Sequence, residues 1–426
     1  MELSKGNSAK YVKEGGTVKK KIIFRLGVFA CILAISGCTP MNDKEMKAFE
    51  EVEGQKSDNN WLTEIEKLKK IKPSDLPKNI NIKVSDGLLV DADISVSSEL
   101  EDYQVSGLKL KQNLFDVDKD LDRLLNLLGN PKVVKREENV SDEVMADDET
   151  FLRINSAYFD NDTFVQVRDR RFMVCGRTNT PYEISTVGGY YSSLFSFPDG
   201  VMEELYLENI ELDFMKVDSA KEKAKHFMED MGVNDICNVR CFSCEESALQ
   251  EEVEKNLLEM KECGLEENEL PKCQKVSKED EGYYIVAQQG YQGVPYLPVS
   301  VDQSLNNTYS LSGTRIELLM TNKGIVDAEV SDLFEVESSG EKMDILSPGD
   351  ILESFIELHN DKTSRVQSVV KHIGLYYLPI LDNKEKMSFN AYPVYCVIYN
   401  QPSTDTDGIN VREYNIFDAM TGERLE

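Results

Sequence analysis

Apolar residues recur at the spacing of an α-helix in three stretches that are each followed by strand patterns. The first helix begins after the capping residue Asp116, and its apolar face comprises Leu121, Leu124, Leu125 and Leu128. The second begins with a capping box from Ser219 to Glu222, and its stripe comprises Ala220, Ala224, Phe227, Met228 and Met231. The third begins with Ser347 and Pro348, and its face comprises Ile351, Leu352, Phe355, Ile356 and Leu358.

Alternating apolar and polar residues predict strands around these helices. Strands 79–84 and 88–96 are joined by the turn signal Asp86-Gly87. Further strands are predicted at 283–289, 294–300, 315–322, 325–330, 372–380, 392–399 and 412–417. A helix followed by antiparallel strands, at least twice, predicts an α+β protein in which each sheet is packed by a helix and the modules repeat.

A basic segment near the start of the chain leads into a short apolar stretch that ends at a cysteine. Residues 22–35 contain Arg25 as their only charged residue, and this stretch is shorter than the roughly 20 residues of a membrane-spanning helix. Ser36 and Gly37 precede Cys38, and small residues at these positions are typical of a signal peptidase site. The segment resembles the lipobox of bacterial lipoproteins, which implies cleavage before Cys38 and diacylation of its sulfur. An uncleaved anchor helix is the alternative.

Residues 1–37 are therefore predicted to be a lipoprotein signal peptide. Lys13-Glu14-Gly15 is what a purine-rich ribosome-binding sequence encodes when it is translated, and Val18 can be a GTG start. We therefore expect translation to begin at Val18, and a long leader is the alternative.

The charge of the chain is strongly acidic. The whole chain has 48 Lys and Arg against 77 Asp and Glu, and residues 1–37 hold seven and two of these. The remaining 389 residues carry 41 basic and 75 acidic side chains, a net charge of −34. Such a surface repels nucleic acid and anionic lipid headgroups. We expect no nucleic-acid partner, and attachment to the outer face of the cell membrane through the lipid on Cys38.

The sequence divides into four parts after the signal. Residues 38–78 are predicted to be a tether with one short helix, on which Trp61, Leu62, Ile65 and Leu68 recur at helical spacing. Trp61 should pack this helix onto the folded body. An N-terminal α+β domain is expected at 79–210, and two further modules at 211–340 and 341–426.

Five cysteines fall within 37 residues: Cys237, Cys241, Cys244, Cys263 and Cys273. An amphipathic helix between the third and fourth of them carries Leu249, Val253, Leu257 and Met260 on one face. In an exported chain this pattern predicts a disulfide-stapled helical insertion at 237–273, with a connectivity that the sequence does not define. Cys175 and Cys396 bring the number of mature cysteines other than Cys38 to seven, so at least one thiol stays unpaired unless molecules cross-link.

Two metal sites are alternatives for this cluster. Cys237-x3-Cys241-x2-Cys244 has the spacing of a radical-SAM iron–sulfur loop, and four of the five cysteines could instead hold zinc. Location outside the membrane disfavours the first, and the lack of a histidine among the cysteines disfavours the second. Disulfides or free thiols are therefore favoured over a metal.

Catalytic motifs are sparse. His226, His359 and His372 are the only histidines, and none lies in an HExxH motif. The sequence contains no serine elbow and no glycine-rich phosphate loop. Carboxylate pairs carry no signal in a mature chain with 75 acidic residues. We predict no catalytic residue, no metal and no cofactor, and structural or surface roles for the histidines.

Several segments of the C-terminal half resemble PepSY modules: 283–286 (YYIV) with Gln289, 293–295 (GVP), and 414–423 (YNIFDAMTGE). The arrangement over 213–426 is similar to the YycH/YycI family, extracytoplasmic proteins that regulate a cell-wall-sensing histidine kinase. This resemblance implies no catalytic residues. A lipid replaces that family's anchoring helix here, and the cysteine-bearing segment has no counterpart in it. The whole chain also resembles uncharacterised lipoproteins of Clostridia, a likeness that implies location only.

The expected function is that of a membrane-anchored extracytoplasmic lipoprotein without enzymatic activity, which binds or regulates a membrane sensor or another cell-envelope protein. Two alternatives remain open. A solute-binding lipoprotein of a transporter would have two lobes with parallel sheets. A carboxylate-dependent cell-envelope hydrolase would place two acids close together in a groove.

Overall fold

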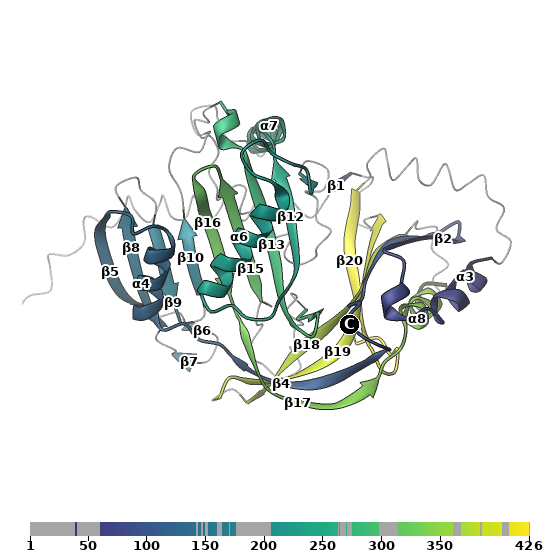
Figure 1. Ribbon diagram of the computed structural model, residues 1–426. Helices are drawn as coiled ribbons and strands as arrows, with labels where there is room; N and C mark the ends of the chain where they lie inside the picture. Colours follow the sequence, from purple (N-terminus) through teal and green to yellow (C-terminus); the bar gives the residue numbers. More distant parts are fainter. Residues whose placement is uncertain are drawn as a thin grey trace, which may run out of the picture.

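Two β-sheets and their helices give the described chain a mixed α+β fold, as predicted (Figure 1). Figure 1 shows the computed structural model of the chain. The structure describes residues 39–40, 60–141, 144–145, 148–149, 152–159, 164–169, 171–175, 206–262, 264, 270, 275–297, 314–360, 368–383, 386–402 and 409–425.

The first sheet, which we call the middle sheet, is built from segments between residues 133 and 331. Its strand order is β11-β12-β13-β15-β16-β10-β9-β8-β5, and β14 pairs with β13. The strands are β5 (Val133–Ser141), β8 (Leu152–Phe159), β9 (Phe164–Arg168), β10 (Arg171–Cys175), β11 (Leu207–Glu208), β12 (Ile236–Cys244), β13 (Gly282–Tyr291), β14 (Val294–Pro295), β15 (Arg315–Thr321) and β16 (Gly324–Ser331). A separate hairpin joins β6 (Val144–Met145) to β7 (Asp148–Glu149).

A helix followed by four antiparallel strands occurs twice in the middle sheet. Helix α4 (Val117–Leu127) precedes β5, β8, β9 and β10, and helix α6 (Val217–Asp230) precedes β12, β13, β15 and β16. The last strands of the two units, β10 and β16, pair antiparallel and form a central seam. Both helices pack on the same face, in one core that includes Leu124, Phe172 and Met228. The two units are therefore related by an approximate two-fold rotation about the seam.

Helix α7 (Glu246–Glu262) covers part of the opposite face. Its Leu249 and Val253 are buried against Phe242 of β12 and Tyr284 of β13. The predicted amphipathic helix after Cys244 is thus confirmed. A 3-10 helix, η3 (Lys278–Asp280), leads from this excursion back into β13.

The second sheet, which we call the terminal sheet, combines strands from both ends of the chain. Its order is β1-β20-β19-β18-β3-β2, and β4 pairs with both β17 and β19. The strands are β1 (Thr39–Pro40), β2 (Asn79–Ser85), β3 (Leu88–Ser95), β4 (Gln104–Gln112), β17 (Phe334–Asp344), β18 (Ser368–Asn383), β19 (Ser388–Pro402) and β20 (Ile409–Asp418). All pairs are antiparallel except β3 with β18.

Helices α3 (Asn60–Leu68) and α8 (Pro348–Asn360) share a core with the terminal sheet. Ile65 and Leu68 of α3 are buried there, Trp61 packs against the same core, and Leu62 is 43% exposed. A 3-10 helix, η1 (Pro73–Asp75), follows α3. The short predicted helix is confirmed, but it belongs to the folded body, so residues 60–78 differ from the expected tether.

Two chain crossings, after β4 and before β17, and the hairpin of β13 and β14 join the sheets. The segment after β4 lies beside the segment before β17, where Asn113 N donates to Leu333 O at 2.8 Å. Gln289 of β13 is 2% exposed, and its side chain bonds both backbone groups of Phe334. Tyr296 packs edge-on against Phe334 with ring centroids 5.4 Å apart. The junction is therefore a packed and hydrogen-bonded part of the core.

The predicted sequential domains do not coincide with the sheets. Strands of the expected domain 79–210 are divided between the two sheets, and β17 of the expected module 211–340 joins the terminal sheet. The reason is long-range pairing, chiefly of β3 with β18 and of β4 with β17.

Two predicted helix starts are confirmed and one is wrong. Asp116 accepts from Lys119 N, and Ser347 Oγ accepts from Asp350 N. The predicted capping box at Ser219 is wrong, because α6 already begins at the buried Val217. The carboxylate of Glu211, six residues upstream, accepts from Val217 N and supplies the cap.

Candidate functional site

The first three cysteines of the predicted cluster lie on a strand. Cys237, Cys241 and Cys244 belong to β12, which pairs with β13 inside the middle sheet. The expected helical insertion at 237–273 therefore begins later than predicted, with α7 at Glu246. Cys263 and Cys273 lie outside the described residues, so their disulfide pairing stays a prediction.

The pleat of β12 separates these thiols. Cys241 packs in the core under α6, and Cys244 packs in the cluster under α7, so the two lie on opposite faces of the sheet. They cannot bond to each other or converge on one iron–sulfur cluster. Cys237 and Cys241 carry free thiols in the structure. The spacing of the cysteines did not predict this separation, because the same spacing is compatible with a strand and with a helix.

Burial keeps these thiols protonated at neutral pH. It raises the pKa of Cys237 to about 12, with help from the Asp235 and Glu99 charges, and the pKa of Cys241 to about 12. Burial also raises the pKa of Cys396 on β19. A protonated thiol is a weak nucleophile. These cysteines therefore fit a structural role.

The raised thiol pKa values predict a loss of stability in alkali. Between the ordinary thiol pKa of 9.0 and about 12, the unfolded chain releases the protons of Cys237 and Cys241 while the folded chain keeps them. As the pH rises, the free energy of unfolding falls wherever the folded state binds more protons than the unfolded state. Here the fall is about 1 kcal/mol per thiol near pH 10. Urea unfolding at pH 8 and pH 10 measures this fall. It should be smaller in a Cys237→Ala, Cys241→Ala variant, and an equal fall in that variant would contradict the assignment.

The three histidines lie on three separate elements. His226 is exposed on α6, 3.5 Å from the carboxylate of Glu229. His359, in the last turn of α8, stacks on Phe355 with ring centroids 4.0 Å apart. His372 is buried on β18, where its Nε2 lies 2.9 Å from the Tyr376 hydroxyl. His359 and Tyr376 face opposite sides of the terminal sheet, so the structure does not bring the histidines together.

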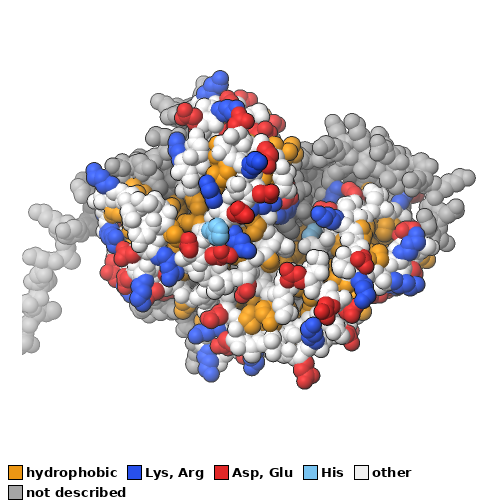
Figure 2. Space-filling view, in the orientation of Figure 1, with side chains coloured by type: hydrophobic (Ala, Val, Ile, Leu, Met, Phe, Trp, Pro, Cys, Tyr) orange, Lys and Arg blue, Asp and Glu red, His pale blue; other side chains and the backbone are white. Residues whose placement is uncertain are grey.

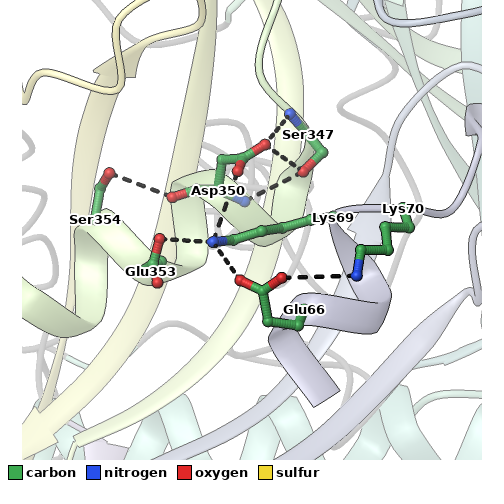
Figure 3. Close-up of polar contacts among 7 residues, drawn as sticks. All are labelled: Glu66, Lys69, Lys70, Ser347, Asp350, Glu353 and Ser354. Atoms are coloured by element: carbon green, nitrogen blue, oxygen red, sulfur yellow. Dashed lines mark hydrogen bonds and ion pairs between the residues drawn. The ribbon is translucent and has the colours of Figure 1, made fainter. Parts of the chain in front are cut away.

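A lysine directly after α3 binds three carboxylates and fastens this helix to α8 (Figure 3). Lys69 Nζ lies 2.7 Å from Glu353 Oε2, 3.0 Å from Glu66 Oε1 and 3.9 Å from Asp350 Oδ1. Asp350 is itself held by Ser347. The hydrogen bond to Glu353 is the largest of the effects that raise the pKa of Lys69. We call Glu66, Lys69, Asp350 and Glu353 the lysine clamp.

A glycine allows the two helices of the clamp to approach. A Cβ on Gly349 would lie 2.7 Å from the backbone nitrogen of Lys69 and 3.1 Å from Ile65 O. Both contacts are with backbone, so a side chain at this position would push the helices apart. Gly349 was not singled out in the sequence, where it follows Pro348 as an ordinary first-turn residue.

Replacing Lys69 by methionine should loosen α3. The variant loses the hydrogen bonds to Glu353 and Glu66, and because Lys69 is only 18% exposed we expect a loss of about 1–2 kcal/mol. Hydrogen exchange of the α3 amides and urea unfolding measure the effect. Lys70→Met is the matched control, since Lys70 is 77% exposed and has one pair at 3.9 Å. Equal effects of the two substitutions would contradict a specific role of the clamp.

A row of polar side chains crosses the middle sheet on the face opposite α4 and α6. It comprises Ser156, Gln166, Arg168, Arg171, Glu317 and Glu329, which we call the polar row. Gln166 donates to Ser156 Oγ at 3.0 Å, and Arg168 Nε donates to Gln166 Oε1 at 2.9 Å. Arg171 Nη2 lies 2.8 Å from Glu329 Oε2 across the central seam. The other face of these strands is apolar core.

Burial sets the polar row apart from ordinary surface charge. Ser156 is 1% exposed and Glu317 is 7% exposed, although both are polar. Buried charge is costly unless it is paired. On the α4 and α6 face, by contrast, Figure 2 shows acidic and basic side chains interspersed on the outer surface.

The sequence did not point to the polar row. Its members come from five strands between residues 156 and 329, and only the register brings them together. The available signal was the placement of Arg168, Arg171 and Glu317 at alternate positions with apolar residues, which is also the pattern of any half-exposed strand.

Comparison with known proteins yields a likeness of fold alone. No family model matches the chain, and neither does any curated protein. A crystal structure of an uncharacterized protein from Eubacterium rectale ATCC 33656 is similar, with a TM-score of 0.65 and 18% identity. The match covers 86% of this chain and 98% of that chain. Within the described part of the chain, no helix has the length and apolarity to span a membrane.

Proposed function

We propose that the protein is a lipid-anchored extracytoplasmic binding or regulatory lipoprotein that acts on a membrane sensor or another cell-envelope protein, without catalysis of its own. The anchor is the diacylated Cys38, at the end of a segment that resembles a lipobox. The proposal extends the resemblance to PepSY modules, since a helix followed by antiparallel strands recurs as α4, α6 and α8 with their strands.

The observation that carries this proposal is the attachment of the anchor-proximal chain to the folded body. Thr39, the residue after Cys38, pairs with Asn410 of β20, and α3 is fastened to α8 by the lysine clamp. A force or displacement at the anchor would therefore reach the terminal sheet directly. Such an attachment suits a protein that must hold its body in a fixed place near the membrane.

The sheets also favour binding over the two alternatives. A solute receptor with parallel-sheet lobes would differ from this chain, in which every described strand pair except β3 with β18 is antiparallel. For a hydrolase, Glu317 and Glu329 are one pair of acids that comes together among the described residues, as direct partners across β15 and β16. Arg171 holds Glu329 in an ion pair, which suits a binding group better than an acid that gives up a proton.

Crosslinking in intact cells tests the proposal. A photoreactive residue at the exposed position Glu222 on α6, or at Glu341 on β17, should capture a defined membrane protein. The same probes in a Cys38→Ser background provide the control, because the released protein should lose this capture.

A further inference from the structure

Helix α3 lies at the rim of the terminal sheet. It contacts α8 and β2, and β2 is the last strand in the order of that sheet (Figure 1). Its apolar contacts come from one stripe, in which Ile65 and Leu68 are buried and Trp61 is half-buried. Helix α8 packs directly on β19 in the same core. The sheet therefore keeps a helix on this face when α3 leaves it.

The length of α3 makes its helical state depend on this docking. Isolated helices shorter than about 12–15 residues are marginal in water, and α3 spans nine residues. A detached α3 would therefore lose its helix as well as its contacts. Elements that open locally in this way differ from the core in having few buried side chains and a place at the end of the folded body.

Three local contacts fix the docked state. Lys69, directly after α3, bonds Glu353 of α8 at 2.7 Å in the lysine clamp (Figure 3). The hydroxyl of Tyr103 donates to Ile71 O at 2.9 Å. The missing side chain of Gly349 lets α8 approach the backbone of Lys69, where a Cβ would lie only 2.7 Å from the nitrogen. These contacts can be changed one at a time without touching the strands of either sheet.

The position of α3 along the chain places it next to the proposed anchor. Thr39 and Pro40 pair with the end of β20, and the next described residue is Asn60, the first residue of α3. A pull on Cys38 therefore acts first on the two register pairs of β1 and then on the N-terminal end of α3. The rest of the terminal sheet bears the load only after α3 has detached.

We propose that residues 60–72 form a latch, which undocks from α8 and β2 as one unit while both sheets stay folded. The docked latch holds the body close to the anchor. Once β1 and the latch are released, residues 41–72 span up to about 110 Å at roughly 3.4 Å per residue, so the body reaches partners far from the membrane. This consequence rests on the proposed lipid anchor. The undocking is a property of the folded chain and is tested without the lipid.

The only tryptophan of the chain reports directly on the latch. Trp61 lies on α3, so its fluorescence emission follows docking, whereas far-ultraviolet circular dichroism follows the strands of both sheets. In a urea titration of the mature chain (residues 38–426), the emission of Trp61 should shift about 1 M or more below the transition seen by circular dichroism. Coincident transitions of the two probes would overturn the proposal.

Two glycine substitutions form a matched pair. Gly349→Ala places a Cβ against the backbone of Lys69 and should move the Trp61 transition to lower urea, while the circular dichroism transition stays within about 0.3 M of the parent chain. Gly340→Ala on β17 is the control, because a Cβ there would meet Gly107 O at an ordinary 3.5 Å and should move neither transition.

A second variant guards against misfolding of Gly349→Ala. Lys69→Met removes the clamp without adding a clash, and it should likewise shift the Trp61 transition alone. Equal shifts of both probes in Gly349→Ala and in Lys69→Met would show that α3 unfolds together with the sheets, and would overturn the latch.

Discussion

Replacing Cys38 by serine is expected to release the protein from the membrane completely. A serine cannot form the thioether to a diacylglycerol, and each buried methylene of an acyl chain contributes about 0.8 kcal/mol to membrane attachment. The two acyl chains of the diacylglycerol therefore decide whether the protein is firmly attached to the membrane or not attached at all. The variant should appear in the soluble fraction after export, and it should incorporate no radiolabelled palmitate.

A second cysteine in the leader provides the control. Cys31→Ser lies within the apolar stretch 22–35 and should leave processing and lipid labelling unchanged. Palmitate labelling of the Cys38→Ser chain at the level of the parent chain would show that the anchor is elsewhere. Retention of Cys38→Ser in the membrane without label would instead favour the uncleaved anchor helix.

Replacing Gln289 by leucine should lower the free energy of unfolding by about 3 kcal/mol. Gln289 Nε2 donates to Phe334 O at 2.7 Å and to Asn234 O at 3.2 Å, and its Oε1 accepts from Phe334 N at 2.8 Å. Leucine has a similar size but cannot make these bonds. The peptide groups of Phe334 would stay buried without partners, and each such group costs about 1–3 kcal/mol.

Urea unfolding measures this loss, and the neighbouring glutamine is its control. Gln288 is partly exposed, and its Oε1 accepts a single hydrogen bond from Asn238. Gln288→Leu should change the free energy of unfolding by less than about 1 kcal/mol. A Gln289→Leu variant as stable as the parent chain would show that the junction between the sheets is held by its aromatic packing alone.

Local signals in the sequence predicted the elements well. Asp116 and Ser347 place helix starts, Asp86-Gly87 places a hairpin, and the apolar stripe of α6 is buried as expected. These features depend on residues within one or two turns of each other. The sequence therefore contains most of the information that defines them.

Long-range pairing could not be predicted. Strand β17 is exposed along most of its length and lacks an apolar alternation. Its partner β4 lies more than two hundred residues earlier, so no local pattern marks the pairing. The division into sheets follows from such pairings, and it does not fall at the expected boundaries 210 and 340. The start of the cysteine-rich insertion differs from the prediction for a related reason: the spacing of Cys237, Cys241 and Cys244 fits a loop, but they lie on β12, which pairs with β13 in the middle sheet.

The candidate site depends on long-range pairing even more than the division into sheets does. The polar row depends on the register of five strands, and a shift by one residue in any of them would move its side chain to the apolar face. The lysine clamp likewise joins residues 69 and 353, which are far apart in the sequence. Sequence patterns identify which residues are polar, but only the pairing identifies which polar residues meet.

Crosslinking in living cells tests the proposed function most directly. Photoreactive residues at Glu222 and Glu341 of the anchored chain should capture one membrane protein reproducibly, and the Cys38→Ser chain should not. Capture of no membrane protein above background, or equal capture by the released chain, would contradict a lipoprotein that acts on a partner at the membrane.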